Sequence, residues 1–248
     1  MKTNLYIPRS YRNFCLNKRF VRFEIRQKES DLFILAKSEL IVQAHKTLSE
    51  LRAQIESYIE IDKNFLTSLK PIEILDSAPE IVKEMARASK KFGVGPMASI
   101  AGVLSERVCR NLLQYSDEVI VENGGDIYII NKEPVTLAIY AGHSPLSMKI
   151  GIEIDAHPEG IAVATSSGTV GHSLSFGNAD AVTVVSKNGS FADAAATAIC
   201  NMVKTKDDIE KALNFASGHS EICGLVIIME EQIGVVGKSI RLKIIDVN

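Results

Sequence analysis

The sequence of 248 residues predicts an α+β fold, a single domain over residues 1–248 in which helices cross an antiparallel sheet. Apolar residues recur at helical spacing between Lys37 and Ile61, which predicts one long amphipathic helix. Apolar and charged residues alternate from Phe20 to Arg26 before a second apolar run, a pattern that predicts a β-hairpin. Asn123-Gly124 lies between two further apolar runs and is typical of another hairpin.

The composition excludes several classes of protein. Charged residues make up 23% of the chain and the formal net charge is −2, so bulk electrostatics recruit neither nucleic acid nor a membrane. The four cysteines are dispersed and form no C-x-x-C pair, so no zinc site is expected. No apolar segment is long enough to span a bilayer, and the first residues lack the apolar core of a signal peptide. We therefore expect a cytoplasmic protein with no membrane partner.

The N-terminal segment, residues 1–36, is unusually basic. Its first 28 residues contain eight Lys and Arg against one Glu, with aromatic residues between them. Such a segment could bind RNA or a phosphate-bearing ligand. The alternation around Phe20 to Arg26 instead favours a basic β-hairpin with one solvated face, so we expect no nucleic-acid partner. Residues 37–248 then form the α+β core.

Proline and glycine residues mark the boundaries of the next predicted segments. A loop follows the first helix from Lys63 to Ser77, and Pro79-Glu80 opens a short helix. A glycine-rich turn leads into a helix from about Met97 to Tyr115, where Ser99 and Gly102 allow close helix packing. Further predicted strands are Val119 to Val121, Ile127 to Ile130, Val135 to Ala141 and Met148 to Ile154, with a turn at His157 to Gly160.

The stretch from Ile161 to Asn201 combines the features of a nucleotide site. An apolar strand, Ile161 to Ala164, precedes a loop rich in glycine and hydroxyl groups, Thr165 to His172, whose backbone N–H groups can approach an anion closely. A strand from Ala181 to Ser186 then leads through a Lys-Asn-Gly turn into a helix that begins near Ser190.

Asp193 and Thr197 are four residues apart and therefore project from one face of this helix. Two oxygen ligands on one face can share Mg²⁺, which accepts one or two carboxylates supplemented by waters and phosphate oxygens. The alanines around them leave room for a large group. The alternative is structural: Ser190 and Asp193 have the spacing of a capping box, and Thr197 can bond back to its own helix.

Ala192-Asp193-Ala194-Ala195-Ala196-Thr197 resembles the A-D-A-x-A-T box of the ApbE superfamily, the FAD:protein FMN transferases. Asn123-Gly124-Gly125-Asp126 is similar to its N-[AG]-G-G-[DN] turn, and Thr165 to Gly168 with His172 to its T-S-G…H segment. The match runs in order from about Pro96 to Cys200, and the short chain points to a small ApbE-like branch.

The resemblance implies an ApbE-like (T-fold-like) architecture, FAD or FMN and Mg²⁺ as cofactors, and an acceptor protein as a partner. It assigns Asp193 and Thr197 to the metal, next to the FAD pyrophosphate, and His172 and Asp193 to catalysis. The residues that it assigns to the flavin nucleotide are Ser99, Asn123, Gly124, Gly125, Asp126, Thr165, Ser166, Ser167, Gly168 and His172. The implied reaction transfers FMN from FAD or cleaves the FAD pyrophosphate.

The chain also departs from the family. The transferase pattern continues H-x-x-D-P, whereas Ser175 and Phe176 stand here in place of the aspartate and the proline. Two alternatives therefore stay open. One is a flavin or nucleotide sensor without catalysis. The other is an accessory role in sulfur assimilation, with which relatives of this branch have been associated, although these residues show no sulfur chemistry.

The C-terminal part is expected to be scaffold. Lys206 to Ala216 predicts an amphipathic helix, and the terminal strands are Cys223 to Met229, Gln232 to Val236 and Ile240 to Ile245. Long strands at a sheet edge favour pairing between subunits, which makes a homodimer an expectation.

Overall fold

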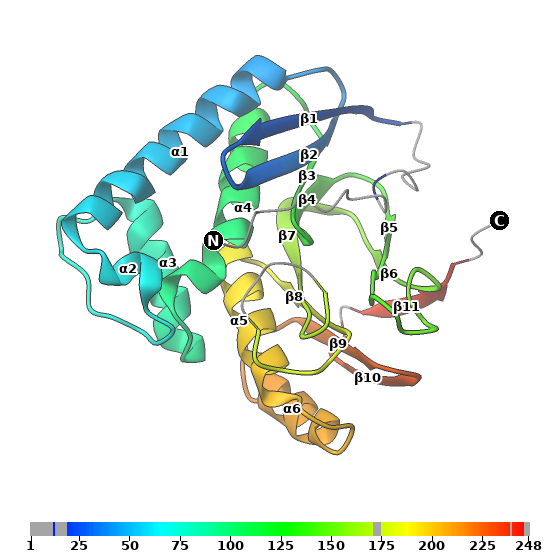
Figure 1. Ribbon diagram of the computed structural model, residues 1–248. Helices are drawn as coiled ribbons and strands as arrows, with labels where there is room; N and C mark the ends of the chain where they lie inside the picture. The colour runs from blue at the N-terminus through cyan, green and yellow to red at the C-terminus, as the bar shows by residue number, and fades with distance from the viewer. Residues whose placement is uncertain (1–11, 13–18, 171–174, 239, 246–248) are drawn as a thin grey trace.

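The computed structural model describes residue 12 and residues 19–170, 175–238 and 240–245, and its fold is α+β (Figure 1). Within these residues, antiparallel pairing builds an eight-stranded sheet in the order β1-β2-β3-β4-β7-β8-β9-β10. A second, three-stranded sheet has the order β11-β6-β5.

The large sheet consists of β1 (Val21–Gln27), β2 (Ser30–Ala36), β3 (Val119–Asn123), β4 (Asp126–Asn131), β7 (His157–Ser166), β8 (Ala181–Ser186), β9 (Gly224–Met229) and β10 (Gln232–Val236). The small sheet consists of β5 (Val135–Ala138), β6 (Ile150–Ile154) and β11 (Arg241–Ile244). The helices are α1 (Ile41–Ile61), α2 (Asn64–Thr67), α3 (Glu80–Phe92), the 3-10 helix η2 (Pro96–Ser99), α4 (Ile100–Leu112), α5 (Gly189–Met202) and α6 (Asp208–Ser217).

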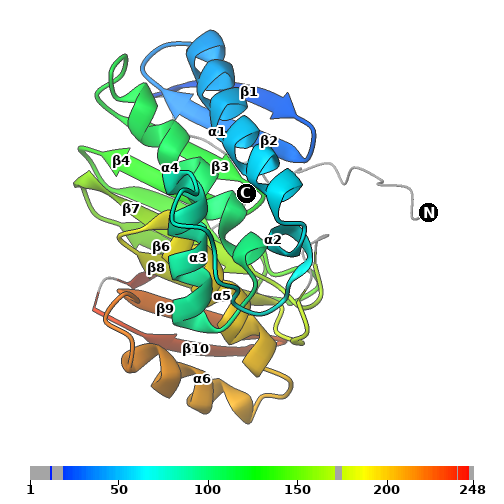
Figure 2. The same cartoon turned by 90° about the vertical axis from the view of Figure 1, so that its left-hand side faces the viewer.

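The large sheet separates two hydrophobic layers. Helices α1, α4, α5 and α6 cover one of its faces with α3 packed outside α5, as Figure 2 shows, and the small sheet lies over the other face. Successive side chains of a strand point to opposite faces, so Ala162 and Ala164 of β7 belong to the helix layer, whereas Ile161 and Val163 belong to the layer between the sheets. The near-continuous apolar strands of the sequence follow from this burial on both faces.

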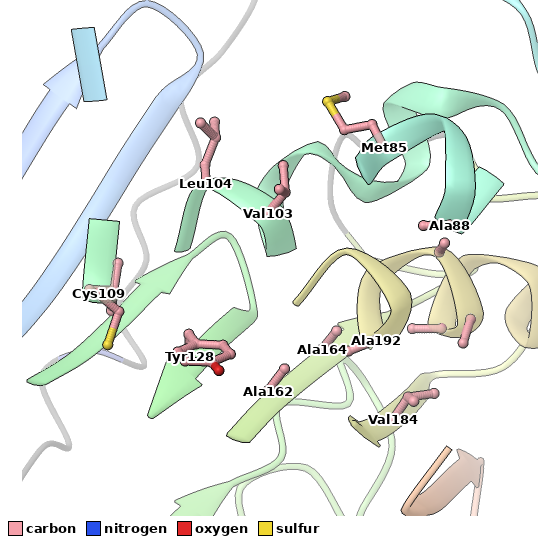
Figure 3. Packing of buried hydrophobic residues seen from close by; sticks show 14 of the residues in the cluster. Met85, Ala88, Val103, Leu104, Cys109, Tyr128, Ala162, Ala164, Val184 and Ala192 are labelled. Carbon is pink, nitrogen blue, oxygen red and sulfur yellow. The ribbon is translucent and has the colours of Figure 1, made fainter. Parts of the chain in front are cut away.

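Helix α5 lies directly against the centre of the sheet. Its alanines at positions 192, 194, 195, 196 and 198 are buried, and Ala192 lies beside the small residues of β7 and Val184 of β8 (Figure 3). The expectation that these alanines leave room for a large group is therefore wrong. Their small side chains bring the helix close to the strands, which fixes the height of Asp193 and Thr197 above the sheet.

Several element boundaries differ from the sequence predictions, among them the following. Strand β7 begins at His157 and not at Ile161, because Asn131 Oδ1 accepts a hydrogen bond from His157 N at 2.9 Å and extends the pairing with β4 past an irregularity. Helix α1 begins at Ile41, and the predicted loop from Lys63 contains the short helix α2, closed by the burial of Phe65.

The predicted basic hairpin is β1–β2, and it joins the large sheet through β3. Its basic residues lie beside carboxylates. Arg12 is buried between β2 and β3, where its guanidinium bonds to Glu122 Oε2 at 2.7 Å and to Asp31 Oδ1 at 2.9 Å. Arg26 contacts Glu24 at 3.1 Å on the solvated side. Strands β1 and β10 are the edges of this sheet, and the homodimer stays a prediction.

Candidate functional site

The predicted site residues gather at one end of the large sheet, where the β3–β4 turn, the end of β7, the N-terminal half of α4 and one face of α5 meet. Ser105 of α4 donates to the Asp126 carbonyl oxygen at 2.9 Å, which ties α4 to the turn. A Cβ placed on Gly125 would lie 3.5 Å from the Thr165 carbonyl oxygen, so the turn lies beside the end of β7.

The turn itself depends on its glycines. Gly124 and Gly125 have φ values of +70° and +102°, which favour glycine strongly. Gly125 N donates to Glu122 Oε1 at 2.8 Å, so the turn is held from β3. Asn123 and Asp126 close it and are buried. The turn is therefore a fixed backbone surface without a side chain at its tip.

Asp193 points from α5 to the N-terminus of α4. The residue is 7% exposed, and its Oδ2 accepts a hydrogen bond from Gly102 N at 2.9 Å. Gly102 is the third residue of α4, so the carboxylate lies at the positive end of that helix. Burial raises the pKa of Asp193 to about 7, and the backbone N–H groups of Gly102 and Ala101 offset part of this rise. The group is thus a buried carboxylate that titrates near neutral pH.

The capping-box interpretation of Asp193 is wrong. Helix α5 begins at Gly189, and its N-cap is Asn188, whose side-chain oxygen accepts from Phe191 N at 3.0 Å. Ser190 lies inside the helix, and its hydroxyl donates to Asn188 Oδ1 at 2.6 Å. Asp193 is consequently directed at another helix and not at its own main chain.

Thr197 lies one turn further along α5 and faces the end of β7. Its hydroxyl oxygen is 3.3 Å from Ser166 Oγ, and the threonine is half-buried. Ser166 follows Ala164 on the helix side of β7. Asp193, Thr197 and Ser166 therefore place one carboxylate and two hydroxyl groups on the same side of the sheet.

The other residues of the hydroxyl-rich loop form hydrogen bonds away from the α5 face. Thr165 faces the opposite side of β7, where its hydroxyl lies 3.0 Å from Thr183 Oγ1. Ser167 Oγ accepts from the N–H groups of Thr169 and Val170, at 3.1 and 2.9 Å, and so closes a local turn. Gly168 N donates to the Ala179 carbonyl oxygen at 2.9 Å. Of the loop hydroxyls, that of Ser166 is the one brought to the α5 face.

Ser99 and His172 are the two remaining predicted site residues. Ser99 is fully buried, and its hydroxyl donates to the Pro96 carbonyl oxygen at 2.8 Å, within the turn that precedes α4. His172 lies outside the described residues, so its catalytic and binding assignments stay predictions. Ser175, which stands where the transferase pattern has aspartate, donates to Cys200 Sγ at 3.0 Å.

The donor atoms on the α5 face suit a hard cation. Carboxylate and hydroxyl oxygens are ligands that Mg²⁺ accepts, and the ion often keeps waters and phosphate oxygens in addition to one or two carboxylates. A carboxylate has about four lone-pair positions, so the bond to Gly102 orients Asp193 without using all of them. Within the described ranges, this site included, no group of three or more His, Cys, Asp or Glu is arranged to hold a metal ion, so water and phosphate oxygens would complete the coordination.

Two carboxylates near the start of α5 were not predicted from the sequence. Glu84 and Glu106 look like ordinary solvent-facing helix residues, yet both are buried at the start of α5. A cavity of about 370 Å³ opens there, beside the predicted site residues and not among them, and is lined by Glu84, Arg87, Glu106, Arg107, Arg110, Asn188 and Phe191.

Gly102 is expected to resist substitution because it is the contact point between α4 and α5. A Cβ on Gly102 would lie 2.1 Å from the Gly189 carbonyl oxygen and 2.8 Å from Asp193 Cβ. Changing Gly102 to alanine should lower the free energy of unfolding by about 1–3 kcal/mol, the cost typical of overpacking. Urea denaturation measures this loss. The matched control is Gly218→Ala, where a Cβ meets only ordinary contacts at 3.5 Å or more. Equal stability of the two variants would contradict the close helix contact.

The raised pKa of Asp193 predicts how the stability of the metal-free protein depends on pH. The folded state keeps a proton on Asp193 up to about pH 7, whereas the unfolded chain releases it near pH 4. The contribution of Asp193 to the free energy of unfolding is therefore fully present below about pH 4 and is lost as the pH rises to about 7. Asp193→Asn lacks the titration. Urea denaturation in a chelating buffer should show that the free energy of unfolding of the variant increases relative to that of the parent protein as the pH rises through this window. A difference independent of pH would contradict the prediction.

Comparisons with known sequences find a matching family model and similar proteins. A family model described as "AbpE bacteria" matches residues 12–221. The UPF0280 protein of Methanococcus aeolicus is 47% identical over 200 residues, which cover 79% of this chain and 81% of the relative. The UPF0280 protein of Methanocaldococcus jannaschii is 41% identical over 201 residues, 79% of this chain and 82% of the relative.

Solved structures show the same fold at low sequence identity. The apo form of the flavinyl transferase ApbE from Pseudomonas stutzeri covers 89% of this chain and 95% of its own, with a TM-score of 0.56 and 12% identity. The ApbE protein of Thermotoga maritima covers 87% of this chain and 96% of its own, with a TM-score of 0.53 and 14% identity. Across the described part of the chain, every helix is too short or too polar to cross a membrane.

Proposed function

The chain belongs to the AbpE bacteria family, and on this premise we propose that it binds a flavin nucleotide, FAD, together with Mg²⁺. The site is the end of the large sheet where the β3–β4 turn, the end of β7 and the α5 face meet. Asp193 and Thr197 bind the metal ion next to the FAD pyrophosphate. The solved proteins of this fold that carry the name flavinyl transferase support the choice of ligand.

The observation that carries the proposal is the direction of two side chains on α5. The Asp193 carboxylate is turned away from its own helix to the N-terminus of α4, and the Thr197 hydroxyl meets Ser166 at the end of β7. A carboxylate in a capping box of α5 and a threonine that bonds back along its helix would both bond within α5. Keeping a buried carboxylate at this position costs stability at neutral pH, which a ligand-binding role explains.

The remaining assignments follow from the surfaces around these two residues. The positive-φ turn at Gly124 and Gly125 gives a flavin or adenine ring a backbone surface free of side chains. When bound, Mg²⁺ polarises the phosphoryl oxygens of the nucleotide. Ser166 and Thr197 orient the diphosphate from the sheet side.

Two outcomes are compatible with such a site. In a transferase, the bond between the two phosphates of FAD breaks, FMN passes to a hydroxyl group of an acceptor protein or to water, and AMP leaves with the electron pair. In a sensor, the nucleotide binds without turnover. Ser175 favours the sensor as the second candidate, because it supplies a hydroxyl bonded to Cys200 where the transferase pattern has a carboxylate.

Incubation of the purified protein with FAD tests the proposal. FAD fluorescence reports binding with and without Mg²⁺, and chromatography separates FMN and AMP from FAD. Formation of FMN and AMP supports the transferase or pyrophosphatase, and Mg²⁺-dependent binding without products supports the sensor. Absence of FAD binding at every Mg²⁺ concentration overturns the proposed function.

A further inference from the structure

Helices α4 and α5 are joined by two hydrogen bonds that mirror each other. Asp193 of α5 accepts from Gly102 N of α4 at 2.9 Å, and Glu106 of α4 accepts from Gly189 N of α5 at 2.6 Å. In each helix the donor lies in the first turn, where backbone N–H groups have no partner within the helix. The acceptor comes one turn later in the same helix. Each carboxylate thus satisfies the N-terminus of the other helix.

The backbones touch at the centre of this reciprocal contact. A Cβ on Gly189 would lie 2.3 Å from the Gly102 carbonyl oxygen, and a Cβ on Gly102 would lie 2.1 Å from the Gly189 carbonyl oxygen. Such an approach is open to glycine alone at both positions. The four residues form one rigid unit because a shift of α5 along α4 would break both hydrogen bonds at once.

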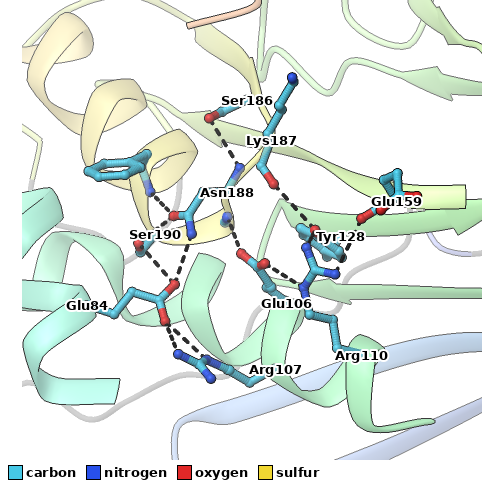
Figure 4. Close-up of polar contacts among 12 residues, drawn as sticks. Glu84, Glu106, Arg107, Arg110, Tyr128, Glu159, Ser186, Lys187, Asn188 and Ser190 are labelled. Carbon is cyan, nitrogen blue, oxygen red and sulfur yellow. Dashed lines mark hydrogen bonds and ion pairs between the residues drawn. The ribbon is translucent and has the colours of Figure 1, made fainter. Parts of the chain in front are cut away.

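Glu106 is held in place from its other side, as Figure 4 shows. Its Oε1 accepts from Arg110 Nε at 2.7 Å, and Arg110 also bonds to the hydroxyl of Tyr128, which is fully buried in the sheet. Glu106 is 6% exposed. The chain of contacts therefore runs from the sheet through Arg110 and Glu106 to the first residue of α5.

We propose that Glu106 is a positioning residue that fixes the start of α5 and thereby holds the Asp193 carboxylate in the orientation that the metal ion requires. This role deepens the proposed function and rests on it for the metal ion. The effect of Glu106 on the orientation of Asp193 does not depend on metal binding and can be measured in the metal-free protein. Glu106 does not itself touch the nucleotide. It acts through the Gly189 N–H and the Gly102–Gly189 contact.

Glu84 provides a matched control. It is as buried as Glu106, at 7% exposed, and it also pairs with an arginine, Arg107. Its contacts with the start of α5 are to the side chains of Asn188 and Ser190, at 3.1 and 3.4 Å, and not to the main chain. Glu84→Ala and Glu106→Ala should both lower the melting temperature, whereas only Glu106→Ala should disturb Asp193.

The first measurement uses the metal-free protein. The amide resonance of Gly102 in an NMR ¹H–¹⁵N spectrum reports the hydrogen bond to Asp193, and Asp193→Ala gives its position without that bond. Glu106→Ala should move the resonance toward that position, while Glu106→Gln, whose amide oxygen still reaches Gly189 N, should restore it. Glu84→Ala should leave it in place. An unmoved resonance in Glu106→Ala, or an equal shift in Glu84→Ala, overturns the proposal.

The second measurement is the Mg²⁺ concentration at half-maximal FAD binding. Glu106→Ala should raise it about tenfold, equivalent to 1.4 kcal/mol, with little change in Glu106→Gln and Glu84→Ala. If Glu106→Ala fails to fold, Glu106→Asp withdraws the carboxylate by one methylene and keeps its charge, and the same results are expected. If the parent protein binds no FAD, the proposed function fails, and the NMR measurement alone decides whether Glu106 orients Asp193.

Discussion

Replacing Asp193 by asparagine is expected to abolish Mg²⁺-dependent FAD binding while the protein stays folded. The amide oxygen of asparagine still accepts from Gly102 N, so the contact between α4 and α5 survives. The amide carries no charge and is a poor ligand for Mg²⁺. The affinity should fall by at least about 100-fold, because even groups that merely support a metal ligand are worth 10–100-fold. Titration of FAD fluorescence at fixed Mg²⁺ measures the loss.

The control for this variant is Asp208→Asn. Asp208 is an exposed carboxylate that accepts from the N–H groups of Lys204 and Thr205 at the start of α6, away from the candidate site. FAD binding by the Asp208→Asn variant should equal that of the parent protein. The metal assignment fails if Asp193→Asn binds FAD with the Mg²⁺ dependence of the parent protein and differs only in melting temperature.

Replacing Arg12 by alanine is expected to destabilise the protein by about 3–5 kcal/mol, the cost typical of removing one partner of a buried ion pair. The Arg12 side chain is 5% exposed, and Glu122 and Asp31 beside it are each 8% exposed. The variant leaves both carboxylates buried without the guanidinium. Urea denaturation followed by circular dichroism measures the change in the free energy of unfolding.

The same substitution should also weaken the β3–β4 turn. Glu122 connects the two, because its Oε2 accepts from Arg12 and its Oε1 accepts from Gly125 N. Arg87→Ala is the control, since Arg87 pairs with Glu80, both side chains are 60% exposed, and such pairs contribute about 0–1 kcal/mol. A loss of similar size in both variants would contradict the buried ion pairs of Arg12.

Local patterns in the sequence predicted most of the fold. The alternation before Gln27, the Asn123-Gly124 turn and the helical spacing after Lys37 each gave the right element, because each depends on neighbours in the chain. The resemblance to ApbE proteins, based on three short motifs, is confirmed by the family match and by the shared fold. The start of β7 was missed because it depends on Asn131, which lies on another strand.

The candidate site, too, was predicted where it depends on local spacing and missed where it depends on contacts distant in the chain. Spacing placed Asp193 and Thr197 on one face of α5, but Ser190 and Asn188 are both good N-cap residues, and the sequence did not show that Asn188 takes this role. The bonds from Asp193 to Gly102 and from Glu106 to Gly189 join residues far apart in the chain. No local pattern distinguishes such buried carboxylates from solvent-facing ones, so these contacts needed the structure.

A crystal of the protein grown with FAD and Mn²⁺ in place of Mg²⁺ tests the central claim most directly, because manganese is located by its anomalous scattering. We expect one manganese peak within about 2.0–2.3 Å of a carboxylate oxygen of Asp193 and of the Thr197 hydroxyl, in contact with the FAD pyrophosphate. A diphosphate bound elsewhere on the protein, or a manganese ion that does not touch Asp193, would contradict the account.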